Sequence, residues 1–277
     1  MSFNYYSISG FGIGLVFKSE GKNYSEGDHV SYPLMDFAEY TVVPESYLPY
    51  LTKIVQHTGL SLSTYLGGAG MPEGQTAYYG WKEFCANFKK GGTAFVSGAA
   101  GPIGSYVVQL AKRDGLKVIA SAGSQAKVNF LKALGADVVV NYKAEGLHLA
   151  LQKNGPVDVY WDNVGGSTLD AALENASLGA HFVICGMISQ YSSMKEGVNM
   201  KNLPNIFTQH ITLHGFRMAE LEGKWKRDFN ETVPEMLASG EIKYHENIVK
   251  GLDKAGDALL DLMAGNSMGK TIILVSN

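Results

Sequence analysis

Thr93-Ala94-Phe95-Val96-Ser97-Gly98-Ala99-Ala100-Gly101-Pro102-Ile103-Gly104 is the stretch that decides the fold. A short apolar run is followed by glycines at 98, 101 and 104 and then by a helical pattern. The first two glycines permit a tight turn and a close approach of a pyrophosphate, and the third lets the helix pack on the strand. Free N–H groups at the start of that helix would bind the anion. Because further strands follow, the spacing predicts a dinucleotide-binding domain rather than a glycine-rich connector.

Apolar, β-branched runs alternate with helical patterns from residue 92 onward, which is typical of βαβ units and a parallel sheet. The runs are almost continuously apolar, as in strands covered on both faces. The predicted strands are residues 93–97, 117–121, 138–140, 157–161, 181–185 and 211–215. The predicted helices between them are residues 102–114, 124–134, 146–153 and 167–178. The predicted fold class is therefore α/β, with a doubly wound parallel sheet.

Residues 1–80 differ from this pattern, since glycine, tyrosine and proline are frequent and no helical period persists. Residues 37–43 are predicted to form a strand that ends at Pro44. Beyond the sixth strand, the predicted elements are a helix over 222–238, a strand over 242–245, a helix over 252–264 and a strand over 271–275. We expect a β-rich substrate domain made of residues 1–82 and 241–277, flanking a nucleotide-binding domain of residues 83–240.

Composition argues against several classes of protein. A formal net charge of −3 over 277 residues disfavours a nucleic-acid partner, which would require a clustered basic surface. No apolar run approaches the roughly 18 residues of a membrane span, and the first residues lack the pattern of a signal peptide. Cys85 and Cys185 are the two cysteines, too few for a disulfide framework or a four-cysteine zinc site. We therefore expect a cytoplasmic protein that binds no metal, no nucleic acid and no membrane.

The end of the second predicted strand bears on the choice between NAD and NADP. An NAD enzyme usually carries an acid there, which bonds the ribose 2′-hydroxyl. Residues 120–127 contain no carboxylate, but they do contain Ser121 and Lys127. A 2′-phosphate would meet small residues, a hydroxyl and a cation rather than a like charge, so the pattern favours NADPH.

Several motifs then follow in order along nearly the whole chain. They are residues 70–78, the glycine loop, residues 121–124 with Lys127, residues 141–143, 162–166 and 185–191, and Gly269-Lys270. On these motifs the chain resembles the zinc-independent medium-chain dehydrogenase/reductase family, especially its NADP-dependent alkenal double-bond reductases and prostaglandin (leukotriene B4 12-hydroxydehydrogenase) reductases. The resemblance implies a Rossmann domain beside a smaller GroES-like domain. It also implies a homodimer formed through the edge of the nucleotide-binding sheet.

The resemblance also assigns roles to residues. Residues 101–104 would hold the pyrophosphate, while Lys127 and Tyr142 would contact the 2′-phosphate. Asn163 and residues 185–191 would border the ribose and nicotinamide, and residues 216–218 would line the nicotinamide side. The complete set of expected cofactor-binding residues is Gly98, Gly101, Pro102, Ile103, Gly104, Gly123, Lys127, Tyr142, Asn163, Cys185, Gly186, Ile188, Ser189, Tyr191, Phe216, Arg217, Met218 and Ser267.

Since no Cys/His cluster is available to polarise a carbonyl, the substrate should already be electron-poor. We expect NADPH-dependent reduction of the C=C bond of an α,β-unsaturated aldehyde or ketone, with hydride transfer to the β-carbon and hydrogen bonds to the enolate oxygen. Tyr191 is the predicted catalytic residue, as proton donor or enolate stabiliser, although it could equally be an aromatic cover on the cofactor. Two alternatives are an NADPH quinone reductase and a non-catalytic NADPH-binding relative inactivated by truncation.

Two features depart from the family pattern. Residues 9–14 resemble a segment that full-length relatives reach only after several dozen residues. The β-rich domain is therefore expected to be shortened at its N-terminal end, with a more open active site. Ser267 stands where relatives usually place an asparagine that reaches the cofactor, and serine has a shorter reach.

Overall fold

The computed structural model describes residues 8–88, 90–191 and 199–275. The chain divides into two compact units, one of Met1–Gly74 with Asn230–Asn277 and one of Gln75–Phe229. These boundaries fall inside helices α1 (Glu73–Phe84) and α7 (Met218–Ala238), whereas the sequence places them at residues 82 and 240. Each of the two helices therefore contributes residues to both units.

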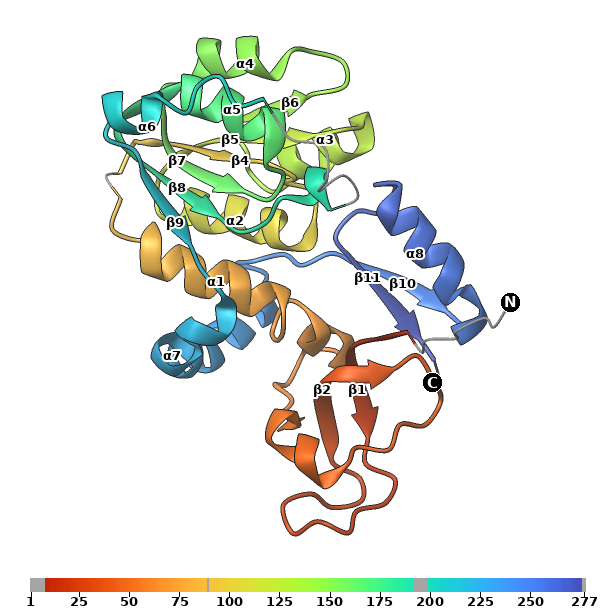
Figure 1. Ribbon diagram of the computed structural model, residues 1–277. Helices are drawn as coiled ribbons and strands as arrows, with labels where there is room; N and C mark the ends of the chain where they lie inside the picture. Colours follow the sequence, from red (N-terminus) through yellow and green to blue (C-terminus); the bar gives the residue numbers. More distant parts are fainter. Residues whose placement is uncertain (1–7, 89, 192–198, 276–277) are drawn as a thin grey trace. The chain divides into compact units, whose positions relative to one another are not determined.

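A six-stranded parallel sheet forms the centre of the unit Gln75–Phe229. Its strand order, β6-β5-β4-β7-β8-β9, is that of a Rossmann fold. The chain adds strands on one side of β4 up to β6 and then on the other side from β7 onward, so the switch point of the strand order lies between β4 and β7. The strands are β4 (Thr93–Val96), β5 (Lys117–Ala122), β6 (Val138–Asn141), β7 (Val157–Asp162), β8 (Ala176–Ile184) and β9 (Thr212–Gly215). Figure 1 shows α4 and α5 above this sheet and α2 below it. The α-helices that lie wholly within this unit are α2 (Pro102–Arg113), α3 (Gln125–Ala133), α4 (Leu147–Asn154), α5 (Gly166–Glu174) and α6 (Asn205–Thr208).

Aromatic side chains fill the core between the central strands. Phe95 of β4 lies opposite Tyr160 of β7, and their rings stack with centroids 4.9 Å apart. Phe182 of β8 meets the ring of Tyr160 edge-on at 5.1 Å. All three side chains are fully buried, and burial of each such side chain contributes roughly 1.5–3 kcal/mol. Strands β4, β5 and β7 are buried along nearly their whole length, as predicted from their apolar sequences, whereas three of the four residues of β9, at the end of the sheet, are exposed.

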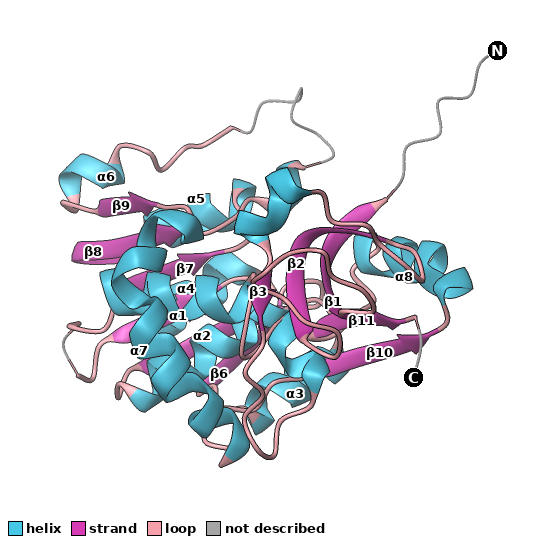
Figure 2. Cartoon of the chain, turned by 90° about the horizontal axis from the view of Figure 1, so that it is seen from below, coloured by secondary structure: helices cyan, strands magenta, loops and turns pink. Residues whose placement is uncertain are grey.

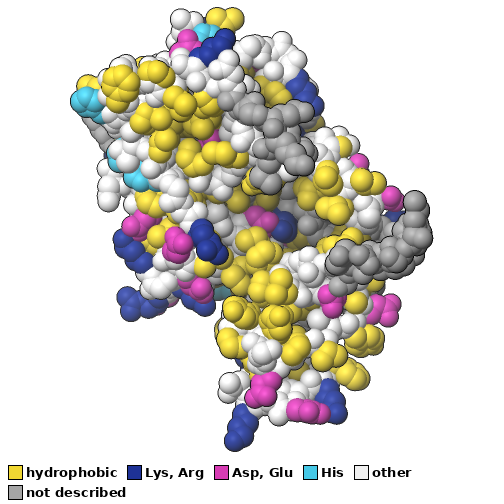
Figure 3. Space-filling view, viewed as in Figure 1, with side chains coloured by type: hydrophobic (Ala, Val, Ile, Leu, Met, Phe, Trp, Pro, Cys, Tyr) yellow, Lys and Arg dark blue, Asp and Glu magenta, His cyan; other side chains and the backbone are white. Residues whose placement is uncertain are grey.

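The second unit combines segments from both ends of the chain. Strands β1 (Ser9–Leu15), β2 (His29–Asp36) and β3 (Thr52–Lys53) form an antiparallel sheet. Strands β10 (Glu246–Lys250) and β11 (Lys270–Leu274) pair in parallel and are connected through α8 (Ala255–Met263). Figure 3 shows hydrophobic side chains gathered over the β1–β2 sheet, where Phe11, Leu15 and Leu34 are exposed. A parallel α/β sheet accompanied by a smaller β-rich unit confirms the predicted fold class.

Some predicted elements are wrong. Residues 37–43 form no strand, because β2 ends at Asp36, where the Ala38 N–H bonds the Asp36 carbonyl at 2.8 Å in a bend. Residues 242–245 precede a strand rather than forming one, since pairing with β11 begins at Glu246. The helix predicted over 167–178 ends at Glu174, because the backbone from Ala176 onward already belongs to β8.

Helix α1 was not predicted at all, and α7 begins four residues before its predicted start at 222. In the described part of the chain, none of the helices combines the length and apolar character that crossing a bilayer requires.

Candidate functional site

The glycine loop joins the end of β4 to the N terminus of α2. Gly98 has a φ of 56°, in the left-handed region that favours glycine, and Gly101 is the extended N-cap of α2. Pro102 opens the helix, and no side chain caps its N terminus. The first-turn N–H groups of Ile103 and Gly104 have no carbonyl acceptor within the helix. A pyrophosphate fits this position, because it would accept hydrogen bonds from those groups.

Residue 104 must be glycine for the loop and helix to approach each other. A Cβ atom at this position would lie 2.6 Å from the carbonyl oxygen of Gly98 and 2.7 Å from the Cα of Ala99. Both are backbone atoms, so the overlap could not be relieved by a side-chain rotation.

The ends of β5 and β6 bring together the residues predicted to bind a 2′-phosphate. Ala122 pairs with Asn141 across the two strands, so Gly123 and Tyr142 leave the sheet side by side. A Cβ atom on residue 123 would lie 2.6 Å from the Tyr142 hydroxyl. Ser124 caps α3, accepting a hydrogen bond from the backbone N–H of Lys127 at 3.4 Å. Glycine at 123 therefore lets the Tyr142 ring approach the N terminus of α3.

Lys143 also belongs to this corner, although it was not among the residues predicted to bind the cofactor. Its Cε atom would lie 3.2 Å from a Cβ on Gly123. Burial, and then the charge of Lys143, lowers the pKa of Lys127. Two ammonium groups that repel each other in this way favour an anion between them. The motif at residues 141–143 already contained this signal, but a lysine after a strand is most often a solvated surface residue.

The end of β7 is joined to the start of the glycine loop by hydrogen bonds. Asn163 donates its side-chain amide to the Ser97 carbonyl at 2.7 Å and its backbone N–H to the Ser97 hydroxyl at 3.0 Å. The indole N–H of Trp161 donates to the Asn163 side-chain oxygen at 3.2 Å. A Cβ on Gly98 would lie 3.3 Å from that of Asn163, so the two loops are in close contact.

The segment after β8 rests on the loop after β7. The backbone N–H of Ile188 bonds the Asn163 carbonyl at 3.2 Å, and the Ser189 hydroxyl bonds the Val164 carbonyl at 2.6 Å. The Tyr191 hydroxyl would lie 3.2 Å from a Cβ on Gly186, and the Tyr191 side chain is exposed. Residues 192–198 lie outside the described residues.

Cys185 precedes this segment and is an unreactive thiol in this setting. Burial and then the charge of Asp162 raise its pKa to about 12. The thiolate needed for nucleophilic chemistry is therefore disfavoured at neutral pH. Within the described residues, no group of three or more His, Cys, Asp or Glu side chains could hold a metal ion.

The three residues after β9 that were predicted to line the nicotinamide differ in how far they are buried. The Phe216 ring is half-buried, 6.0 Å from Trp161 and 5.6 Å from Phe84 between centroids. Arg217 is exposed, and Met218 opens α7. Ser267 belongs to the other unit, so its expected contact with the cofactor stays a prediction.

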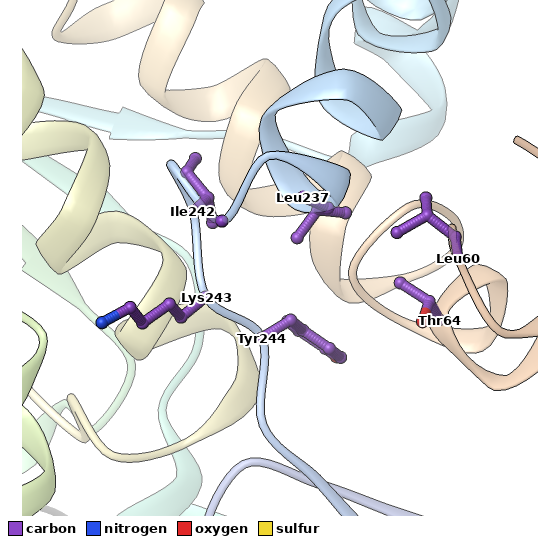
Figure 4. A pocket seen from close by; sticks show the side chains of 7 residues that line it. Leu60, Thr64, Leu237, Ile242, Lys243 and Tyr244 are labelled. Carbon is purple, nitrogen blue, oxygen red and sulfur yellow. The ribbon is translucent and has the colours of Figure 1, made fainter. Parts of the chain in front are cut away.

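A small cavity of about 280 Å³ lies in the unit that contains both chain ends, between Leu60, Thr64, Leu237 and Tyr244. Figure 4 shows the Lys243 side chain pointing away from Leu60 and Thr64. None of the expected cofactor-binding residues lines this cavity. The candidate site is the carboxyl edge of the parallel sheet, which is formed by the loops that follow its strands.

The comparison with known proteins agrees with this arrangement. A family model described as zinc-binding dehydrogenase matches residues 102–238. The chain is 37% identical over 274 residues to a 2-alkenal reductase (NADP(+)-dependent) from Nicotiana tabacum, covering 97% of this chain and 77% of the relative. The chain therefore belongs to the medium-chain dehydrogenase/reductase family, in its zinc-independent branch of double-bond reductases.

Two further relatives are similarly close. The chain is 36% identical to (+)-pulegone reductase from Mentha piperita over 274 residues, or 98% of this chain and 78% of that protein. The crystal structure of CurA in complex with NADPH from Vibrio vulnificus matches with a TM-score of 0.86 at 30% identity, covering 97% of this chain and 80% of that one. The resemblance stated from the sequence motifs is therefore confirmed.

Proposed function

We propose that this protein reduces the C=C bond of α,β-unsaturated aldehydes or ketones with NADPH. The observation that carries the proposal is that the glycine loop, the Lys127–Lys143 corner and the Tyr191 segment all follow strands at the carboxyl edge of one parallel sheet. Relatives with 36–37% identity are named as reducing 2-alkenals and pulegone, which supports the same chemistry here.

The chain offers a fitting group for each part of the cofactor. The N terminus of α2 supplies N–H groups for the pyrophosphate, while Lys127, Tyr142 and Lys143 supply two cations and a hydroxyl for the 2′-phosphate. Asn163 and the segment from Cys185 to Tyr191 would border the ribose and nicotinamide. When bound, NADPH supplies the hydride that is added to the substrate's β-carbon.

Tyr191 is the residue that we expect to contact the reacting part of the substrate. The Tyr191 side chain is exposed and its hydroxyl lies near Gly186, so it could donate a hydrogen bond to the oxygen of the developing enolate. The same hydroxyl could deliver a proton to the α-carbon, directly or through water. A purely packing role for the ring, as a cover on the nicotinamide, is the alternative.

A substrate panel tests the proposal. The purified chain would be given NADPH or NADH with an enal, an enone and a quinone, with absorbance of the cofactor and the identity of the product as readouts. We expect NADPH oxidation with the enal or enone, a saturated carbonyl product, and much poorer use of NADH. Turnover of the quinone alone would instead make the protein a quinone reductase. NADPH binding without turnover of any acceptor would make it a non-catalytic binder.

A homodimer formed through β9 is also proposed. This strand ends the six-stranded sheet beside β8, as Figure 2 shows, and Leu213 on it is exposed. An exposed strand edge with apolar side chains is suited to pairing with a second copy. Light scattering on the wild-type chain should give twice the monomer mass and Leu213→Lys should give the monomer mass. A monomeric wild type would contradict the proposal.

The cytosol is the location we propose, because both cysteines are free thiols and one is buried in the core of its unit. Fractionation of the source cells with an antibody to the chain would test this, and recovery in an oxidising compartment would contradict it.

A further inference from the structure

Asp162, the last residue of β7, carries a buried carboxyl group with very uneven hydrogen bonding. Its side chain is fully buried. One oxygen, Oδ1, accepts from the Tyr160 hydroxyl at 2.6 Å, the Ser97 hydroxyl at 3.1 Å, and the backbone N–H groups of Val164 at 2.9 Å and Gly165 at 2.8 Å. The other oxygen, Oδ2, is buried with no hydrogen-bond partner among the described residues. A buried acceptor without a partner costs free energy. All four hydrogen bonds of the Asp162 carboxyl group converge on Oδ1, so the structural contribution of this side chain depends on the position of that oxygen.

Tyr160 lies on β7 itself, but the other three donors to Oδ1 belong to loops that border the candidate cofactor site. Ser97 lies directly before the glycine loop, and Val164 and Gly165 form the turn after β7. Gly165 has a φ of 70°, which glycine adopts without a steric penalty, and this conformation presents its backbone N–H to Oδ1.

The turn at residues 163–165 in turn holds the segment that carries Tyr191. The Val164 carbonyl accepts from the Ser189 hydroxyl at 2.6 Å and from its backbone N–H at 3.2 Å. The backbone N–H of Tyr191 in turn bonds the Ile188 carbonyl at 3.4 Å. A continuous series of hydrogen bonds therefore runs from Asp162 through Val164 and Ser189 to the start of the segment that ends at Tyr191.

We propose that Asp162 is a positioning residue, whose Oδ1 atom fixes the turn at residues 163–165 and, through it, the segment at residues 188–191 against the start of the glycine loop. The role we give it in turnover rests on the proposed reductase function, but its role in loop position does not. What matters is the acceptor oxygen rather than the charge.

Burial raises the pKa of Asp162, and hydrogen bonds from Gly165, Tyr160 and Val164 oppose that rise. An asparagine would keep an oxygen at the Oδ1 position and would place its amide nitrogen where Oδ2 already lacks a partner. Asp162→Asn and Asp162→Ala therefore separate the acceptor from the charge.

Hydrogen exchange of backbone amides, followed by mass spectrometry on the full chain without substrate, is the test. In Asp162→Ala, peptides covering 163–166 and 185–191 should exchange about tenfold faster or more, while peptides from β4, β5 and β6 keep the wild-type rate. Asp162→Asn should exchange as the wild type does. Unchanged exchange in Asp162→Ala, an increase spread evenly over the whole sheet, or equally fast exchange in both variants would overturn the proposal.

Tyr160→Phe keeps the test decisive if Asp162→Ala does not fold. It removes the shortest bond to Oδ1 but leaves the carboxylate and its backbone donors in place. Faster exchange, confined to the same two segments, is the expected result, and no change there would overturn the proposal.

Turnover adds a second, separable readout. If the wild type reduces an enone, kcat should fall by about tenfold or more in Asp162→Ala and stay within about threefold of wild type in Asp162→Asn, because small displacements of a catalytic group are costly. A full wild-type kcat in Asp162→Ala would overturn the link to turnover. An inactive wild type would refute the proposed function alone, since exchange is measured without any reaction.

Discussion

The charge of Lys143, two residues after β6, lowers the pKa of Lys127 on α3, so the two side chains repel each other when both are charged. Burial is the larger cause of the shift, and both causes disfavour the charged form of Lys127. A phosphate placed between the two groups would relieve the repulsion. We expect this arrangement to favour a cofactor with a 2′-phosphate over one without it.

Lys143→Ala should therefore weaken NADPH more than NADH. The loss of one charge-assisted hydrogen bond, ~1.4 kcal/mol or more, corresponds to an increase of about tenfold in Kd for NADPH. Titration of cofactor fluorescence measures both constants. Lys132→Ala, an exposed lysine on the same helix as Lys127, is the control and should bind as the wild type does. Equal weakening of NADPH and NADH by Lys143→Ala would exclude a phosphate contact.

Gly104→Ala should damage the phosphate loop. The added Cβ would meet the Gly98 carbonyl at 2.6 Å, and overpacking against backbone typically costs about 1–3 kcal/mol of the free energy of unfolding. We expect a lower melting temperature and NADPH affinity reduced by about tenfold or more.

Gly223→Ala in α7 is the matched control, because nothing lies within 4 Å of its added Cβ. Alanine is the better helix former, so this variant should be more stable by up to ~1 kcal/mol and should bind NADPH normally. Normal NADPH binding by Gly104→Ala would contradict the close approach described for the loop.

Tyr191→Phe should lower kcat with an enone by about 100-fold or more, the usual scale for loss of a general acid or of one oxyanion donor. NADPH affinity should stay nearly unchanged, because the ring is retained. Stopped-flow absorbance in a single turnover would separate the hydride step from product release. An unaltered kcat would leave the ring with a packing role only.

Stability should fall on acidification because of a histidine pair in the sheet. His214 on β9 lies 3.1 Å from His181 on β8 (Nε2 to Nδ1), and its ring stacks on Phe84. Burial and then the charge of His181 hold the pKa of His214 below its usual value near 6.5. The folded state thus favours neutral His214, so its stability is complete above about pH 6.5 and is lost as pH falls toward the lowered folded pKa.

Urea unfolding of the wild type and of His214→Gln at pH 8, 6 and 5 would measure this loss, which should be smaller in the variant. His210→Asn is the control, because His210 is exposed with a φ of 52° that asparagine tolerates. If the free energy of unfolding of the wild type fell with pH in parallel with that of His214→Gln, His214 would not be the cause of the acid destabilisation.

Local sequence was sufficient for the parallel sheet and for the loops after its strands, which are the loops we expect to bind the cofactor. The strands at 93–97 and 157–161 could be predicted because strands covered on both faces are apolar along nearly their whole length. The glycines at 98, 101 and 104 predicted the tight loop because a close approach of backbone to backbone leaves no room for a Cβ atom.

Helix α1 shows where local sequence was insufficient. It contains Gly74 and Gly80 and several aromatic residues, which are poor helix formers. Its stability comes from packing: Tyr79 lies edge-on to Phe229, and a Cβ on Gly80 would meet Phe216 and Trp161 at 2.7 Å. Such contacts between residues distant in the chain leave no periodic signal.

By itself, then, the sequence determined the fold class, the family and the edge of the sheet that forms the candidate site, because these depend on short-range patterns. Only the tertiary structure brought the charge of Lys143 to bear on Lys127 and gave Asp162 its partners after β4 and after β7. The physical reason is register: which side chains meet at the ends of β5, β6, β4 and β7 depends on how the strands align, and neighbouring residues in the chain do not specify that alignment.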